Sequence, residues 1–191
     1  MSRLTAVLLA SLLSLTLRLG AQVPAAEVQI SGAVSAAPES LRAGATVLGY
    51  TNYHKLVTLR QGTNALICLA DDPSEAMWHV ACYHRDLEPF MALGRELRNQ
   101  GRTRAEIDSL RLAAVEAGTI KMPNHPTALF SLFGRGDSVD AATGVAKGAV
   151  PLYVIYIPYA TGESTGLPTQ PSGGPWLMFP GKPWAHIMIS K

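Results

Sequence analysis

Short alternating runs of apolar and polar residues dominate the first half of the chain. Residues 45–50, 55–60 and 65–70 are β-prone and are separated by connections of only about four residues. Connections that short join antiparallel neighbours, so we expect these strands to pair in chain order. A fourth run at 77–84 follows the turn-like residues 71–74, which predicts one more hairpin.

The spacing of apolar residues then changes to that of a helix over residues 87–99. Asp86 is a candidate cap, Pro89 is tolerated in a first turn, and Gly101 is a stop signal. The predicted apolar face of this helix contains Phe90, Leu93 and Leu97.

A second helix is predicted to begin at a capping box formed by Thr103 and Glu106, and to end at Gly118. Its predicted buried stripe contains Ile107, Leu110 and Ala114. The two helices should form a hairpin on one face of a sheet. Their outer faces mix acidic residues with Arg95, Arg98, Arg102 and Arg111, a pattern typical of a solvated surface.

The remaining elements define the fold class. A short helix is expected within the alanine-rich residues 25–37, and β-prone runs return at 119–122, 127–133, 152–159 and 185–189. Both alternating sets are apolar in the 152–159 run, which predicts a central strand covered on both faces. We therefore expect an α+β fold with a mostly antiparallel sheet and a helical hairpin on one face.

The N-terminus has the pattern of a cleavable secretory signal peptide. Arg3 precedes an uncharged apolar run over residues 4–17, which is too short to span a bilayer before Arg18. We place cleavage after Ala21, with residues 23–25 as a second possible site. Residues 1–21 are thus expected to be a signal peptide, and residues 22–191 a single globular domain in the periplasm or outside the cell.

Loss of this leader changes the charge of the protein. Arg3 and Arg18 are two of the 16 Lys and Arg, so cleavage would leave these equal in number to the 14 Asp and Glu. A neutral domain gives no electrostatic reason to bind nucleic acid, and without its leader it is not expected to insert stably in a membrane.

Two cysteines, Cys68 and Cys82, are predicted to form a disulfide, because an exported protein matures under oxidising conditions. The two residues would lie on adjacent strands if the turn centres near Glu75. A reactive or metal-binding thiol pair is the alternative.

Histidines suggest metal chemistry only weakly. On one strand, His79 points away from Cys82 and His84, so these residues do not form a recognised ligand set. His186 and Met188 share a face of the last strand, but two ligands are too few for copper. The sequence therefore predicts neither a metal site nor a cofactor.

Aromatic residues give the leading candidate for a ligand site. Tyr159, Trp176 and Trp184 border the Gly- and Pro-rich residues 161–175 or the next turn, and His186 follows closely. Aromatic faces beside a long loop suit sugars or peptides. The alternative is that these side chains anchor the loop to the core.

These observations favour an exported, non-catalytic binding or interaction domain. The competing hypothesis is a small secreted hydrolase or metal-dependent enzyme built around His84 or His186. A pocket in which His186 meets a carboxylate, a hydroxyl or a second histidine would favour the enzyme. Packed, isolated histidines would favour binding or structure.

Several segments together resemble one family of proteins. They are residues 59–64, 68–73, 82–84, 157–161, 165–168, 175–178 and 185–189. The final segment, Ala-His-Ile-Met-Ile, is the most distinctive. On these segments the chain resembles an uncharacterised group of exported bacterial proteins, and Lys182 stands where that group has a small polar residue. The resemblance implies export from a bacterium and no particular activity.

Overall fold

A computed structural model describes residues 23–52 and 55–190 of the chain. The predicted signal peptide and its cleavage after Ala21 lie outside the described residues, whereas the second possible cleavage site, residues 23–25, lies within them. Among the described helices, none has the length and apolar character needed to cross a bilayer.

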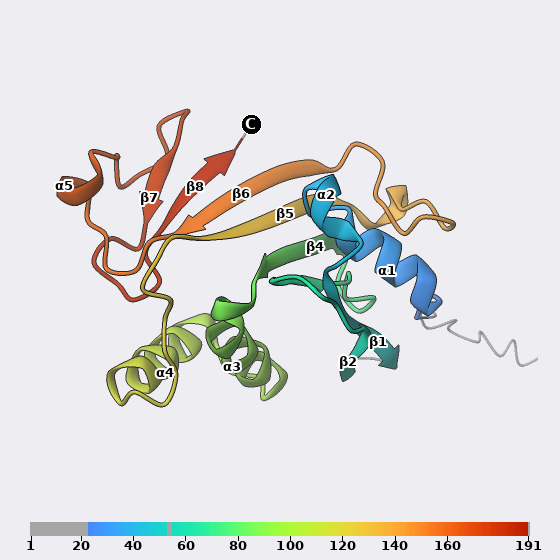
Figure 1. The fold of residues 1–191 in the computed structure, drawn as a ribbon, viewed down its shortest axis with the longest axis horizontal. Helices are drawn as coiled ribbons and strands as arrows, with labels where there is room; N and C mark the ends of the chain where they lie inside the picture. Colours follow the sequence, from blue (N-terminus) through green and yellow to red (C-terminus); the bar gives the residue numbers. More distant parts are fainter. Residues whose placement is uncertain (1–22, 53–54, 191) are drawn as a thin grey trace, which may run out of the picture.

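Eight strands form one sheet in the order β2-β1-β3-β4-β5-β6-β8-β7 (Figure 1). The strands are β1 (Thr46–Asn52), β2 (Lys55–Arg60), β3 (Leu66–Leu69), β4 (Met77–His84), β5 (Thr127–Arg135), β6 (Val150–Tyr156), β7 (Trp176–Met178) and β8 (His186–Ser190). All neighbours are antiparallel except β1 and β3. The predicted α+β class with a mostly antiparallel sheet is therefore confirmed.

Helices pack on both sides of this sheet. They are α1 (Ala26–Val34), α2 (Glu39–Arg42), α3 (Glu88–Asn99), α4 (Arg104–Glu116) and α5 (Gly162–Thr165), with short 3-10 turns η1 (Arg85–Leu87) and η2 (Gly136–Ser138). Figure 1 shows α3 and α4 side by side below the strands, and α1 at the other end of the sheet. The predicted helical hairpin on one sheet face is thus present.

The pairing of the first three strands differs from the prediction. β3 does not pair with β2 but lies on the other side of β1, parallel to it. After β2 the chain crosses the start of β1, where the backbone N–H groups of Thr63 and Asn64 both donate to the carbonyl of Gly44. A side chain at Gly62 would overlap the backbone of Thr46, so this crossing needs glycine.

The predicted disulfide is confirmed. Cys68 and Cys82 face each other on β3 and β4, and their sulfur atoms are bonded. Both residues are fully buried on the α1 side of the sheet. The crosslink therefore joins two neighbouring interior strands inside the core that α1 covers.

Two hydrophobic cores lie on opposite faces of the sheet. The first, under α1, includes Ala33, Val47, Cys68, Trp78, Val80 and Cys82. The second, under the α3–α4 hairpin, includes Tyr83, Leu87, Phe90, Val154, Tyr156 and Trp184. Alternate residues of β4 enter different cores, as strand geometry requires.

The start of α3 corrects the prediction made for Asp86. The helix begins at Glu88, its N-cap residue is Leu87, and no side chain caps it. Asp86 instead lies in η1 beside the ring of His84. Pro89 is in the first turn as predicted, and Gly101 ends the element with a positive φ of 75°.

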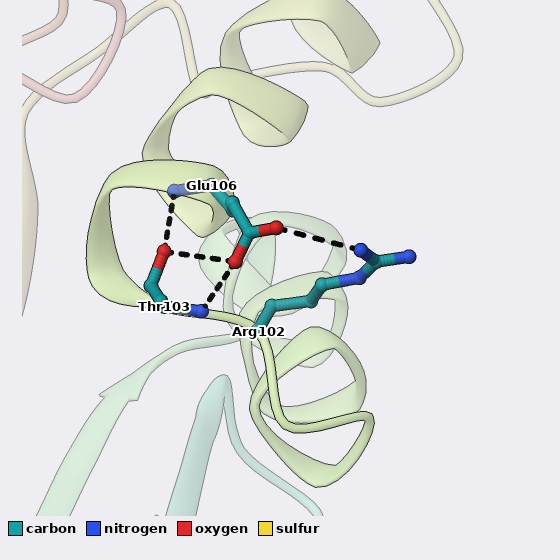
Figure 2. Close-up of polar contacts among 3 residues, drawn as sticks. All are labelled: Arg102, Thr103 and Glu106. Carbon is teal, nitrogen blue, oxygen red and sulfur yellow. Dashed lines mark hydrogen bonds and ion pairs between the residues drawn. The ribbon is translucent and has the colours of Figure 1, made fainter.

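The capping box of α4 is confirmed (Figure 2). The Thr103 hydroxyl accepts from the Glu106 backbone N–H at 3.4 Å, and the Glu106 carboxylate accepts from the Thr103 backbone N–H at 2.7 Å. Arg102 approaches the other carboxylate oxygen at 3.4 Å. These contacts lower the pKa of Glu106, the backbone hydrogen bond from Thr103 being the main cause.

The face of α4 that packs on the protein differs from the predicted buried face. Ile107 is buried, but Leu110 is 42 % exposed. Arg111 takes the inward position instead, with its guanidinium 4.0 Å from the centre of the Phe90 ring. A side chain at Gly94 would overlap this guanidinium, so glycine in α3 makes room for it.

Two predictions about later strands are also corrected. Residues 119–122 form no strand, because the Thr119 N–H and hydroxyl both bond the Ala114 carbonyl and complete the end of α4. β6 lies between β5 and β8 as expected of a central strand, but it ends at Tyr156. Val154 and Tyr156 are buried on one face, whereas Tyr153 and Ile155 on the other face are only half-buried.

Removal of the disulfide should destabilise the fold. In the chain-entropy model, a crosslink between positions separated by 14 residues restricts the unfolded chain and contributes about 3 kcal/mol. We expect the double variant Cys68→Ala/Cys82→Ala to lose about that much free energy of unfolding in urea denaturation. Reductant should destabilise the parent protein and leave the double variant unchanged. Equal stability of the two proteins without reductant would contradict the assigned role.

Gly62→Ala tests the crossing of the chain over β1. The new methyl group would meet the backbone of residues 44–46, which cannot move without disturbing β1. We expect a loss of about 1–3 kcal/mol of unfolding free energy. Gly174→Ala is the matched control, since no atom lies within 4 Å of a side chain there. Similar losses in both variants would show that the close approach of the backbone at Gly62 does not decide the effect.

Candidate ligand-binding cleft

The four residues predicted to bind a ligand lie in different environments. Tyr159 is 58 % exposed and lines a cavity of about 760 Å³ beside the end of α4. Trp176 is half-buried on β7, the edge strand, where it pairs with Met188. Among the described residues, the ring contacts of Trp184 and His186 include neither Tyr159 nor Trp176.

Trp184 and His186, by contrast, are core residues, only 6 % and 7 % exposed. Trp184 packs on the rings of Phe90 and Phe179. Nδ1 of His186 lies 2.7 Å from the carbonyl oxygen of Trp184, and because a carbonyl can only accept, this nitrogen carries the proton. Burial lowers the pKa of His186 and keeps the ring neutral. The structure thus gives this pair a packing role, and ligand binding by the four residues stays a prediction.

A larger cavity, of about 1080 Å³, lies on the same face of the sheet as the helical hairpin. The hairpin packs over Tyr83 and the strands beyond it, and leaves the face of β1, β2 and the first half of β4 uncovered. The space between α3 and this uncovered face is a cleft, which we call the sheet–α3 cleft. Its lining comes from the strands β1 to β5, the helices α3 and α4, and the connection between β3 and β4.

The floor of the cleft follows from the alternation of two neighbouring strands. His79, Ala81 and Tyr83 of β4 face the cleft, opposite residues 129, 131 and 133 of β5. The His79 and Phe133 rings are stacked, with centroids 4.3 Å apart. This floor is mostly apolar, with a flat imidazole–phenyl surface near one end.

One wall is supplied by α3 and carries the arginines Arg95 and Arg98 together with the carboxylate of Glu96. Arg95 donates to the Glu88 carboxylate at 2.7 Å and to the Tyr83 hydroxyl at 2.8 Å. The Tyr83 hydroxyl in turn donates to Glu88 at 2.5 Å. Burial acts to lower the pKa of Arg95, but Tyr83 and Glu88 outweigh it and the pKa is raised. Arg98, one turn further along α3, also lines the cleft.

The opposite wall is acidic. Asp71, Asp72 and Glu75, all from the connection between β3 and β4, line it. Asp71 accepts a hydrogen bond from the backbone N–H of His79 at 2.8 Å, yet burial dominates and raises its pKa to about 6. Burial, followed by the charge of Asp72, raises the pKa of Tyr50 on the adjoining strand.

These positions correct the expectation of a solvated arginine surface on the hairpin. Arg95 and Arg111 are half-buried, and Arg95, Arg98 and Arg111 line the cleft. Burial lowers the pKa of Arg111 to about 10, and its Nε atom has no hydrogen-bond partner in the described structure. Sequence reasoning missed these residues because charged helix positions are usually exposed.

One pair in the cleft has the composition of a hydrolytic dyad but lacks its geometry. His79 Nε2 lies 3.4 Å from the Ser131 hydroxyl, beyond the usual 2.6–3.2 Å reach of a general base. Burial lowers the pKa of His79. Among the described hydrogen bonds, none joins the His79 ring to a carboxylate, because Asp71 bonds its backbone instead. The pair therefore lacks the group that orients the base in a catalytic triad.

A separate group of side chains offers ligands for a metal ion. His84, Asp86 and His125 each place a nitrogen or oxygen atom within 4.8 Å of the others. None of them lines the sheet–α3 cleft, and His125 borders the smaller cavity.

Comparison of the chain with protein-family models, with curated proteins and with solved structures finds no match. The likeness to an uncharacterised group of exported bacterial proteins therefore stays a prediction, and the function must be argued from the cleft itself.

The raised pKa of Asp71 predicts a pH-dependent stability. The folded protein binds this proton more tightly than the unfolded chain, so the stability from protonated Asp71 is lost as pH rises from about 4 to about 6. Asp71→Asn cannot ionise and retains an oxygen for the His79 N–H. We expect this variant to be more stable than the parent by about 1 kcal/mol near neutral pH, and equally stable near pH 4.

Urea denaturation across this pH range measures the difference. Asp140→Asn is the control, and its effect on stability should be opposite to that of Asp71→Asn. Hydrogen bonds from Thr143 and Ala142 lower the pKa of Asp140. That variant should be less stable than the parent near neutral pH. A pH-independent effect of Asp71→Asn would show that the pKa of Asp71 is not raised in the folded protein.

Proposed function

We propose that this protein is an exported, non-catalytic binding domain that holds a short peptide with free termini in the sheet–α3 cleft. The observation that carries the proposal is that Arg98 and the carboxylates of Asp71 and Asp72 line one cavity with a mostly apolar floor. A peptide matches this arrangement, because it has an anionic end, a cationic end and apolar side chains between them.

The charges of the two walls are available to a ligand. Among the ion pairs of the described residues, none includes Arg98, Asp71 or Asp72. A peptide carboxylate near Arg98 and an ammonium near Asp71 and Asp72 would supply both missing counterions.

The floor supports a peptide by shape and polarity. Leu48, Leu69, Ala81 and Leu129 offer apolar contact, and the stacked rings of His79 and Phe133 offer a flat surface. A cavity of about 1080 Å³ is at the upper end of the range for small-molecule sites, which suits a ligand of several residues.

Binding in the cleft is favoured over hydrolysis by the surroundings of His186 and His79. His186, a residue of the enzyme hypothesis, meets a backbone carbonyl and the rings of Tyr156 and Phe179, not a carboxylate or a hydroxyl. His79 and Ser131 are in the cleft but are not joined in a triad. A site of this kind can hold a ligand without activating a nucleophile.

Export rests on the leader pattern of residues 1–21 and on the Cys68–Cys82 disulfide. Disulfides persist mainly in oxidising compartments, which supports a periplasmic or extracellular location. The resemblance to exported bacterial proteins points the same way.

Calorimetric titration with hydrophobic tripeptides tests this function. We expect a tripeptide such as Leu-Leu-Leu to bind with free termini, and to bind at least about ten-fold more weakly when it is N-acetylated or C-amidated, because each blocked end loses one charged contact. Arg98→Glu should weaken binding of the free peptide by at least about ten-fold, and should weaken binding of the amidated peptide much less.

Lys182→Glu is the matched control, since it makes the same charge change at an exposed turn outside the cleft. It should leave the affinity unchanged. The proposal fails if free and blocked peptides bind equally, if neither binds, or if Arg98→Glu and Lys182→Glu weaken binding to the same extent.

A further inference from the structure

Three metal-ligating side chains converge at the point where β4 leads into α3. His84 is the last residue of β4, Asp86 is in η1, and His125 lies in the segment that precedes β5. Nδ1 of His84 is 3.5 Å from an Asp86 carboxylate oxygen, and Nε2 of His125 is 3.4 Å from the same oxygen. The three ligand atoms all lie within 4.8 Å of one another.

These separations match the coordination sphere of zinc. Zinc binds histidine nitrogen and carboxylate oxygen at about 2.0–2.2 Å, so two ligand atoms of a tetrahedral site are about 3.4 Å apart. Both histidine-to-carboxylate distances are within about 0.1 Å of that value. To bind zinc, the Asp86 oxygen would therefore need to move little relative to either histidine. The two histidine nitrogens would need to move closer to each other.

Hydrogen bonds define which nitrogen of each imidazole carries a lone pair near Asp86. Nδ1 of His125 lies 3.1 Å from the side-chain oxygen of Asn124, which only accepts, so Nδ1 carries the proton and Nε2 offers its lone pair. Nδ1 of His84 accepts from the Asp86 backbone N–H at 3.3 Å, so it too is unprotonated when the ring is neutral, and zinc would replace this hydrogen bond. Both histidine nitrogens can therefore act as ligands beside the Asp86 carboxylate.

The backbone around the site is well supported. The Arg85 N–H donates to the Ala65 carbonyl and fixes the chain directly after His84. Pro123 and Pro126 flank the segment that carries Asn124 and His125, and each proline restricts its own φ. The Asn124 contact is of the type that orients histidine ligands in metal sites.

We propose that His84, Asp86 and His125 form a zinc site with one open coordination position. Two histidines and a carboxylate are the ligand set of several catalytic zinc sites, whereas structural sites are closed by four protein ligands. The side chains are 31 %, 42 % and 51 % exposed, so the open position faces solvent. The site borders the smaller cavity through His125 and does not depend on peptide binding in the sheet–α3 cleft.

Calorimetric titration of the tag-free, metal-free mature protein with zinc chloride tests the site. We expect one equivalent of zinc to bind. His125→Gln and Asp86→Asn should each weaken binding by at least about ten-fold, and Asn124→Ala by about ten-fold because it frees the His125 ring to rotate. His79→Gln is the matched control, since this histidine faces the cleft, and its affinity for zinc should equal that of the parent.

Nitrogen NMR of the imidazole rings locates the ion independently. Zinc should shift Nδ1 of His84 and Nε2 of His125, while the His79 and His186 signals stay in place. His125 is in an exposed segment, so His125→Gln should keep the fold, which thermal melting of the metal-free protein checks. The proposal is overturned if zinc does not bind, if His125→Gln binds as tightly as the parent, or if the shifts occur at other histidines.

Discussion

The alternation of side chains along β4 determines how the rest of the molecule is arranged. Val80 and Cys82 point into the core under α1, whereas Ala81 and Tyr83 point to the face that carries the hairpin and the cleft. Because β4 is joined to β3 by the disulfide and pairs with β5 along seven residues, its register fixes both faces at once. A slip of one residue would exchange the two faces, which the buried crosslink prevents.

The position of α3 depends on the polar network of Tyr83, Glu88 and Arg95. These groups are half-buried or buried, and leaving any of them without its partners would cost the free energy of an unsatisfied polar group. The network holds the start of α3 over the end of β4. Arg98 is then placed one turn along the same helix face, toward the cleft. A contact made for packing thus also orients the basic wall.

Much of the local structure could be predicted from the sequence, because its causes lie within a few residues. The capping box at Thr103 and Glu106 and the strand alternation that pairs Cys68 with Cys82 are such cases. The passage of the chain over β1 could not be predicted, since it depends on Gly62 fitting against a backbone that is distant in sequence. The shift of Arg111 to the inner side of α4 likewise depends on Phe90 and Gly94 of another helix.

The candidate sites were harder to predict for the same reason. Aromatic residues near a loop suggested a ligand site, but Trp184 and His186 are needed to fill the core between α3 and the last strands. The cleft is made of charged residues from two segments, 71–75 and 95–98, that only the tertiary fold brings to one cavity. A glycine in the middle of α3, Gly94, was the one local sign of close packing there.

A single short segment supports both sites. Tyr83 and Glu88 hold Arg95 at the wall of the cleft, and His84 and Asp86, which lie between them in the chain, face His125 on the other side. Tyr83 and His84 are successive residues of β4 and point to opposite faces, so this segment can serve two sites without the ligands meeting. An ion held by His84 and Asp86 would restrain η1, and through it the first turn of α3 that carries Glu88. The zinc site, although separate from the cleft, would therefore stiffen the wall against which a peptide binds.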